Sequence, residues 1–332
     1  MKHFKKIIIS SSFFLFSTVI VLTGLEFFLR MYNSNGLNYD IEMWKYGNTI
    51  KEVSANQLIG SEHKLLKSGI FENTEIKINL LGFRDREYSV AKPSDVYRII
   101  VLGSSITLGW GVPQNKVYTE IVEERLNENL RNEKIEIINA SVGNFNTTRE
   151  VEYFFERCSY LNPDMVILSF FVNDAEILSP PTDNYFMNNS QLAVLLWSRL
   201  QHLSRRMGLR KDSVEYYKEM YADENPGWLK SQKALTRIAD YVKKEHKRAL
   251  VTMIPDMQNL QSYSLSFIHD KVEKKTRSLS FEFIDFYDVL KTIQSNDIFV
   301  IPGDPHPNIE THRIMADYLY DYLSDSQPWG NR

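Results

Sequence analysis

Three residues in this sequence have the types and the setting that nucleophilic ester chemistry needs. Ser105 stands in Gly103-Ser104-Ser105, where the apolar run VYRIIVL ends. A serine hydroxyl becomes a nucleophile when a neighbouring base takes its proton, and histidine is the usual base. His306 lies in GDPHPN, two residues after Asp304, and a carboxylate can hold an imidazole in one tautomer. Prolines on both sides of His306 stiffen this loop, so we expect Asp304 and His306 to be held together.

Attack on an ester carbonyl also requires donors for the oxyanion, each worth about 3 kcal/mol. The N–H of Ser105 qualifies because backbone N–H groups gather at a strand-to-helix turn. Gly143, in NASVGNFNTT, can present a backbone N–H, and Asn173, in FFVND, a side-chain amide. Each residue also has a simpler interpretation: Ser105 as a helix N-cap, Gly143 as a turn glycine, and Asn173 with Asp174 as a loop turn. We expect Asp174 to be a structural partner.

Apolar runs alternate with amphipathic stretches from residue 96 onwards. Short β-branched runs predict strands buried on both faces, and apolar residues at helical spacing predict helices. Repeated strand-helix units predict an α/β fold, a three-layer α/β/α sandwich with a central parallel sheet, and its chemistry gathers at the carboxyl ends of the strands. The predicted strands are 96–102, 135–141, 163–172, 248–254 and 281–286, and the predicted helices are 117–130, 147–161, 229–245, 267–279 and 309–323.

The segments at these strand ends resemble the four blocks of the SGNH (GDSL-type) hydrolase superfamily, in order, over roughly residues 80 to 323. VLGSSITLGWGV is similar to the first block, INASVGNFNT to the second, FFVND to the third and GDPHPN to the last. The resemblance implies an SGNH/flavodoxin-like fold with Ser105 as nucleophile, His306 as base and Asp304 as its orienting acid. It also implies Gly143, Asn173 and the Ser105 N–H as oxyanion donors.

One residue departs from the family pattern. The first block usually reads Gly-Asp-Ser, and Ser104 stands where the aspartate belongs, with a shorter reach and no charge. The resemblance implies a serine esterase acting on acyl esters, most simply acetyl esters. LGFRDREY and the preceding apolar segment resemble anchored members of the superfamily, which modify cell-surface polysaccharides. Two alternatives stay open: an O-acyltransferase on the same substrates, and a non-catalytic glycan-binding or assembly protein whose site Ser104 disables.

The N-terminal 30 residues predict a membrane anchor or an uncleaved signal. Ile7 to Leu25 carries no charge over 19 residues, which at about 1.5 Å per residue approaches the roughly 30 Å hydrocarbon core of a bilayer. Lys2, Lys5 and Lys6 precede it, so the positive-inside rule puts the N-terminus in the cytoplasm and the rest outside. We expect a lead-in segment at 31–95 that packs on the main domain, with INLLGFRDREY (78–88) as a strand and turn, and a hydrolase-like domain at 96–325.

A helical insertion is expected at about 176–227, lying over the top of the sheet. Its aromatic residues are expected in the core, although they could also stack on sugar rings. The stretch RLQHLSRRMGLRK predicts a solvated basic helix face, with contact to a membrane surface or an acidic polymer as the alternative. The aromatic residues are Trp197, Tyr216, Tyr217 and Tyr221.

Composition excludes several classes of protein. A net charge of −3 argues against nucleic acid as a partner, because phosphate binding needs a basic face. The single cysteine, Cys158, excludes an internal disulfide and a cysteine-based zinc site. We expect no cofactor and no metal, although Asp304, His306 and His312 remain conceivable ligands. The expected partners are an acylated glycan or small ester, and the membrane through the N-terminal helix.

Overall fold

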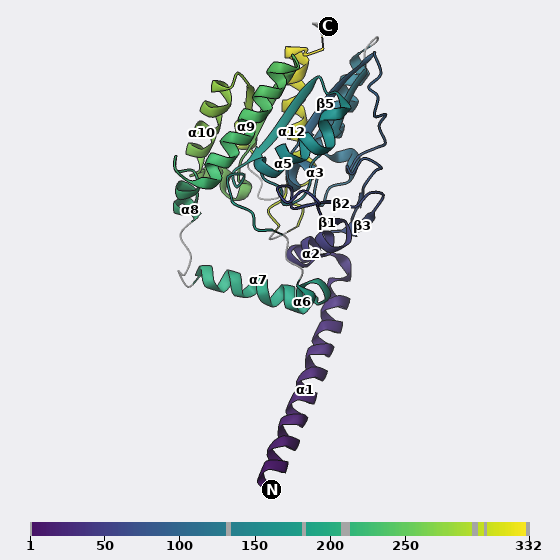
Figure 1. Cartoon of the computed structure of the whole chain (residues 1–332), viewed down its shortest axis with the longest axis vertical. Helices are drawn as coiled ribbons and strands as arrows, with labels where there is room; N and C mark the ends of the chain where they lie inside the picture. The colour runs from purple at the N-terminus through teal and green to yellow at the C-terminus, as the bar shows by residue number, and fades with distance from the viewer. Residues whose placement is uncertain are drawn as a thin grey trace.

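The fold is a three-layer α/β/α sandwich with a long helix projecting from one end (Figure 1). The computed structural model describes residues 2–130, 134–180, 184–206, 213–293, 298–301 and 304–329. The central sheet has five parallel strands in the order β6-β5-β7-β8-β9. The strands are β5 (Val96–Leu102), β6 (Lys134–Asn139), β7 (Met165–Phe171), β8 (Arg248–Ile254) and β9 (Glu282–Asp285). These are the five predicted strands, and the predicted fold class is confirmed.

The strand order reverses between β5 and β7, because the chain moves from β5 to β6 on one side and then returns to β7 on the other. At such a switch point the loops that leave neighbouring strands diverge and open a crevice at the carboxyl ends. The loop after β5 carries Ser105 and the loop after β7 carries Asn173. The topology therefore brings these two residues to one place.

Helices cover both faces of the sheet, and each face has its own apolar core. Alternate residues of β5 show this: Ile100 and Leu102 enter one core, and Ile99 and Val101 the other. The first face is covered by α5 (Thr147–Tyr153), α9 (Pro226–Lys244) and α10 (Ser266–Ser278); the second by α4 (Tyr118–Asn129), α11 (Tyr287–Leu290) and α12 (Ile309–Ser326). After Tyr153, α5 continues as one π-helical turn (Phe154–Cys158) and a 3-10 turn (Ser159–Leu161). The other 3-10 turns are Asn33–Asn35, Gln114–Lys116 and Met257–Ser262.

The segment before the sheet forms one helix and two hairpins. Helix α2 spans Tyr39–Thr49, β1 (Lys51–Val53) pairs with β2 (Ser61–His63), and β3 (Ser68–Phe71) pairs with β4 (Thr74–Lys77). Residues 78–88 form turns and bends, so the strand expected there is wrong. The reason is local: the Asn79 side chain accepts the N–H groups of Leu81 and Phe83, which a ladder would have used.

Helix α1 (Lys2–Tyr32) is long and apolar enough to cross a membrane, and it extends away from the sandwich (Figure 1). Between β7 and α9 the chain forms α6 (Tyr185–Asn189), α7 (Gln191–Arg206) and α8 (Ser213–Met220). Helix α7 packs against α1 and α2, so it does not lie over the sheet as expected. The four aromatic residues of this region divide: Tyr221 is buried and Tyr217 partly buried, whereas Trp197 and Tyr216 are exposed.

A buried arginine joins the lead-in segment to the loop after β5. The guanidinium of Arg84 donates to the carbonyls of Leu108, Gly109, Val112 and Glu75 at 2.5–3.0 Å. Burial lowers the pKa of Arg84 to about 10, which leaves it charged at neutral pH. A buried charge is costly unless hydrogen bonds compensate it, so these carbonyls and the cation need one another.

We expect Arg84→Met to destabilise the protein by at least ~3 kcal/mol, because buried carbonyls lose their only charged donor. Arg157→Met is the control: Arg157 is 44% exposed and pairs with Glu62 at the surface, so its loss should cost ~1 kcal/mol or less. Urea unfolding of the full chain in detergent micelles measures both. Equal losses in the two variants would contradict the structural role of Arg84.

Candidate active site

Ser105 begins the short helix α3 (Ser105–Leu108) directly after β5. The turn that leads into it requires glycine, because a Cβ on Gly103 would lie 2.5 Å from Thr107 Oγ1. The helix ends at Gly109, whose φ of +82° few other residues adopt. Ser105 is thereby fixed at the carboxyl end of a central strand with its side chain at the surface of a cleft.

His306 comes from the other end of the chain, in the loop before α12. An isolated antiparallel bridge between Phe299 and Pro307 and a hydrogen bond from Val300 N–H to the His306 carbonyl hold this loop. Asn308 then caps α12 by accepting the N–H of Thr311 at 3.0 Å. Gly303, the first residue of GDPHPN, lies outside the described residues. The loop is thus fixed on both sides of the imidazole.

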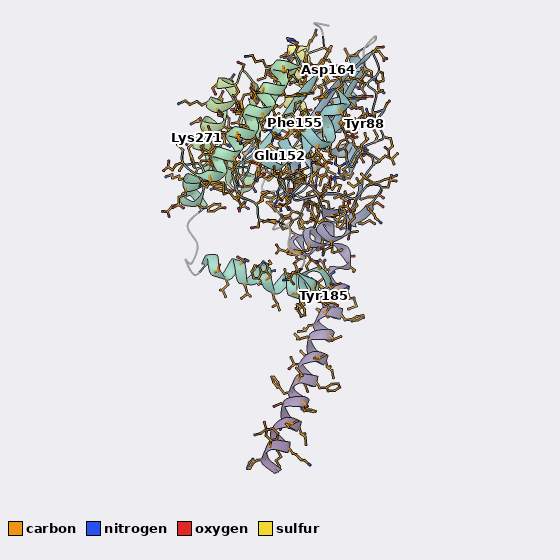
Figure 2. The ribbon with its side chains drawn as sticks, in the orientation of Figure 1. Tyr88, Glu152, Phe155, Asp164, Tyr185 and Lys271 are labelled. Carbon is orange, nitrogen blue, oxygen red and sulfur yellow. The ribbon has the colours of Figure 1, made fainter. Side chains whose placement is uncertain are left out.

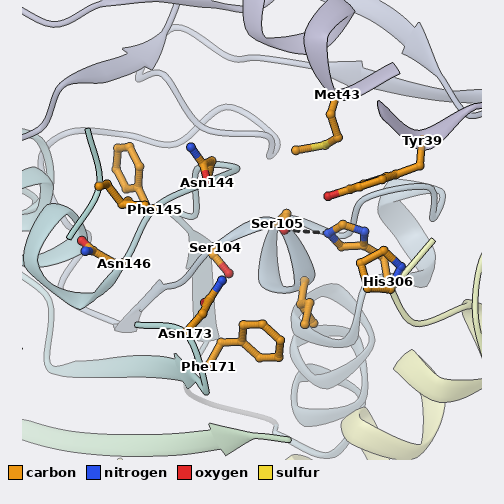
Figure 3. Close-up of a pocket in the computed structure, with 13 residues that line it drawn as sticks. Tyr39, Met43, Ser104, Ser105, Asn144, Phe145, Asn146, Phe171, Asn173 and His306 are labelled. Carbon is orange, nitrogen blue, oxygen red and sulfur yellow. Dashed lines mark hydrogen bonds between the residues drawn. The ribbon is translucent and has the colours of Figure 1, made fainter. Parts of the chain in front are cut away.

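The structure brings Ser105, His306 and Asp304 into one hydrogen-bonded row. Figure 3 shows its contact between His306 and Ser105. His306 Nδ1 lies 2.5 Å from Asp304 Oδ1, and His306 Nε2 lies 2.7 Å from Ser105 Oγ. An ionised carboxylate only accepts, so Nδ1 carries the proton and donates to Asp304. Nε2 is then unprotonated and accepts from the Ser105 hydroxyl. This is the protonation pattern that a general base beside a nucleophile needs.

Asp304 is buried and still held in its charged form. Burial raises the pKa of Asp304, but hydrogen bonds from His306 and Glu72 and the electrostatic attraction of the His306 ring outweigh it and bring the pKa below the ordinary value. The His306 backbone N–H donates to Asp304 Oδ1 at 2.7 Å, and Trp110 Nε1 donates to Oδ2 at 3.2 Å. The side chain therefore has donors on both oxygens, which fixes its plane against the imidazole.

Glu72 is a second buried carboxyl beside Asp304. Burial, followed by the hydrogen bond to Asp304 and its charge, raises the pKa of Glu72 to about 9. At neutral pH Glu72 is therefore protonated and donates to the Asp304 carboxylate. It sits in the tight turn of the β3–β4 hairpin at a φ of +47°, a strained conformation for glutamate. The pairing of β3 with β4 keeps Glu72 in this strained conformation. Its protonated carboxyl group is a further donor to Asp304.

Of the expected oxyanion donors, Asn173 lines the cleft and Gly143 does not. Asn173 lines the cleft beside Ser105, and its side chain points toward Ser104 (Figure 3). Gly143 is buried outside the cleft, and its N–H donates to Tyr46 Oη at 3.1 Å. The residue that lines the cleft instead is Asn144, with a φ of +63°. The N–H expected from Gly143 is therefore directed at a tyrosine.

The cleft itself is small, about 140 Å³, below the roughly 300–1,000 Å³ of sites for drug-sized ligands. The rings of Tyr39 and His306 lie 5.5 Å apart across it. Besides the residues already described, it is lined by Tyr39, Met43, Ile106, Phe145, Asn146, Phe171, Leu178 and Pro305.

Two polar residues near these motifs lie away from the row. Asp174 accepts from the Thr147 hydroxyl at 2.9 Å, and burial raises its pKa to about 8. His312 in α12 accepts the Tyr118 N–H at 3.3 Å and stacks on its ring, and burial lowers its pKa to about 3. Neither lines the cleft at Ser105.

The strand order and the flanking helices define an α/β/α sandwich whose candidate site lies at the carboxyl ends of the strands. The GDSL-like lipase/acylhydrolase family matches residues 101–314, and the chain belongs to this family. No curated protein matches the chain.

Solved structures similar to this chain include TesA, with 13% identity over 68% of this chain and 97% of that one and a TM-score of 0.44. The acetyl xylan esterase AlAXEase shows 16% identity over 68% and 99%, with a TM-score of 0.46. A two-domain esterase, CEX, active on acetylated mannans, shows 17% identity over 69% of this chain and 49% of its own, with a TM-score of 0.45.

Sequence reasoning missed Glu72, Trp110, Tyr39 and Asn144. Glu72 and Tyr39 lie more than 200 residues from His306, in a segment whose pattern carries no catalytic signal. Asn144 directly follows Gly143, and asparagine is among the few residues that tolerate positive φ. That tolerance was the one signal in the sequence that could have pointed to it.

In the native protein we expect the free energy of unfolding to fall as pH rises because of Glu72, and in Glu72→Gln we expect this fall to be lost. Glu72 holds its proton when folded up to about pH 9 but releases it when unfolded near its usual pKa of 4.5, so the free energy of unfolding falls as pH rises between these values. The slope is up to about 1.4 kcal/mol per pH unit. Unfolding from pH 5 to 9 measures it. Glu75→Gln, at an exposed site on the same hairpin, should keep the slope; a native slope in Glu72→Gln would disprove this assignment.

Proposed function

We propose that this protein is a serine esterase that hydrolyses acyl esters, with Ser105, His306 and Asp304 as its catalytic triad. The observation that carries the proposal is the 2.7 Å contact between His306 Nε2 and Ser105 Oγ, with Asp304 on the other nitrogen. Membership of the acylhydrolase family supports the same reaction class.

In the first half-reaction His306 Nε2 takes the Ser105 hydroxyl proton as Oγ attacks the ester carbonyl carbon. The carbonyl π electrons move to oxygen and form the tetrahedral oxyanion, while Asp304 stabilises the imidazolium. When the intermediate collapses, the bond to the alcohol oxygen breaks and His306 gives its proton to that oxygen. In the second half-reaction water attacks the acyl-enzyme, His306 accepts its proton, and the acid leaves as Ser105 regains its own.

Three donors around the cleft suit the oxyanion: the Ser105 N–H, the Asn173 amide and the backbone N–H of Asn144. Asn144 replaces Gly143 in this role, since the Gly143 N–H is taken by Tyr46. Ser104 replaces the usual aspartate without a charge, and its side chain lies against Asn173 (Figure 3). We propose that Ser104 orients Asn173.

The size of the cleft favours a small acyl group, most simply acetyl. A larger groove of about 640 Å³ adjoins it and shares Met43 and Asn144 with it. The groove offers an aromatic face from Trp44 and polar groups from Asn48 and Arg149, which suit a sugar ring. We therefore propose an acylated glycan as the substrate, with its acyl ester in the cleft and its chain in the groove.

Helix α1 supports a location at the membrane. We propose that α1 crosses the bilayer with the N-terminus in the cytoplasm, because Lys2, Lys5 and Lys6 precede the apolar stretch. The catalytic domain is then tethered outside the cytoplasm, where surface glycans are found. The lead-in segment belongs functionally to this domain, since it supplies Glu72 and Tyr39 to the site.

A serine-directed fluorophosphonate should form one covalent adduct with the full chain, read by intact mass. Ser105→Ala should abolish the adduct, and His306→Ala should slow it by at least ~100-fold because the hydroxyl loses its base. Ser104→Ala, one residue away, should still form the adduct even if more slowly, which separates the labelled serine from its neighbour. Folded protein without an adduct would contradict the proposal and favour a non-catalytic glycan-binding role.

Asn173→Ala should lower kcat on a small acetyl ester by about 10²–10³-fold with little change in KM, because it removes one oxyanion donor. Asn144→Gly is the matched control: it keeps the backbone N–H and suits a positive φ, so it should retain most of the activity. Steady-state kinetics on both variants measures the difference. If Asn144→Gly loses as much as Asn173→Ala, the donor at 144 is not the backbone.

The same assay with an acetylated oligosaccharide separates hydrolysis from transfer. A hydrolase releases acetate at a rate that added glycan acceptor does not raise. A transferase would release little acetate alone and form an acetylated acceptor when one is supplied.

A further inference from the structure

Helix α7 is amphipathic, and its apolar side has no partner in the described part of the chain. Val194 and Ser198, four residues apart, are buried against α2, and the Ser198 hydroxyl donates to Asp40. Two residues further along, the same helical spacing brings Leu196, Leu200 and Leu203 to the opposite side, since two residues turn a helix by roughly 200°. These three leucines are each more than half exposed, and so is Trp197 beside them.

The start of α7 is tied to α1 at the end of its apolar stretch. The Glu26 carboxylate accepts the N–H groups of Gln191 and Leu192 at 3.0 and 2.9 Å and the Ser190 hydroxyl at 2.8 Å. Arg30 pairs with Glu26 at 2.6 Å and donates to the Asn189 carbonyl at 2.7 Å. Glu26 caps the helix dipole of α7, so the two helices are joined by charged hydrogen bonds.

This junction sets the depth of α7 relative to a bilayer. The uncharged stretch of α1 ends at Leu25, one residue before Glu26. With that stretch filling the roughly 30 Å hydrocarbon core, Glu26 lies at its outer boundary. In Figure 1, α7 runs crosswise to α1 from this point, below α2. The leucine side, opposite α2, therefore faces the direction in which α1 extends, toward the lipid.

Aromatic residues gather at the same level. Tyr185 lies at the junction of α6 with α1 (Figure 2), and Tyr185 and Phe186 are each 74% exposed. Phe28 and Tyr32 at the end of α1 are also exposed. Tyrosine and tryptophan concentrate where a membrane meets water, because their rings are apolar and their polar groups stay hydrated.

We infer that α7 is an interfacial helix, lying in the outer surface of the membrane that α1 spans with Leu196, Leu200 and Leu203 in the lipid. The inference rests on the proposed membrane insertion of α1. It gives the domain a second membrane contact beyond its tether, and buried apolar area at an interface adds to binding. Because α2 packs on α7 and carries Tyr39 and Met43 into the cleft, this placement puts the α2 side of the cleft next to the helix at the membrane.

Spin-label accessibility in liposomes tests this placement on the full chain. Single cysteines are introduced at Leu200, at Leu203, at Val19 within α1 and at Glu128, with Cys158 replaced by alanine. Glu128 is an exposed residue in α4 at the amino end of the sheet, so it is the aqueous control. Nitroxides on these sites are compared for collision with oxygen, which concentrates in lipid, and with a water-soluble nickel complex. Labelling with the fluorophosphonate checks that each variant is folded.

Labels at Leu200 and Leu203 should resemble Val19, with an oxygen-to-nickel accessibility ratio several-fold above that of Glu128. A lipid-like ratio at Val19 with Glu128-like ratios at both leucines would overturn the inference while leaving the anchor intact. Low accessibility to both reagents at the leucines would also overturn it, because a protein partner would then cover this face. An aqueous ratio at Val19 would reject the anchor itself and, with it, the inference.

Discussion

The buried guanidinium of Arg84 is the interaction on which the rest of the site depends. Its four carbonyl acceptors include three from the loop that follows Ser105 and one from the β3–β4 hairpin. A buried cation cannot release these acceptors without a large cost, so the loop and the hairpin are fixed relative to each other. The hairpin carries Glu72, and the loop directly follows Ser105. The segment before the sheet is for this reason part of the site and not a spacer between membrane and domain.

Around this fixed point the site is built from polar groups that constrain one another. Asp304 takes donors from His306, Trp110 and Glu72, and this keeps it charged in a buried position. The charged Asp304 fixes the tautomer of His306, and the tautomer leaves Nε2 open to the Ser105 proton. In many enzymes, electrostatic preorganisation of this kind makes the largest contribution to the rate enhancement, because the groups need no rearrangement when charge develops.

Helices α1, α7 and α2 form a series of contacts that ends at the cleft. Glu26 links α1 to α7, Ser198 and Val194 link α7 to α2, and Tyr39 and Met43 extend from α2 into the cleft. Hydrogen bonds and packing contacts therefore link the apolar helix α1 to the imidazole of His306.

The sequence by itself determined the sheet and its helices, because buried parallel strands have a local apolar signature. It also put Ser105 and Asn173 at carboxyl ends of strands, which share one edge, and the family resemblance implied Asp304 and His306. The residues 78–88 were misread as a strand because the Asn79 side chain satisfies the backbone there. Only the tertiary structure decided which residue of this loop lines the cleft: the Gly143 N–H donates to Tyr46, almost 100 residues earlier, and Asn144 lines the cleft. It also decided the role of Glu72, since the pKa of a carboxyl is set by neighbours distant in sequence, and the position of α7, since a helix pattern shows an apolar face but not what that face meets.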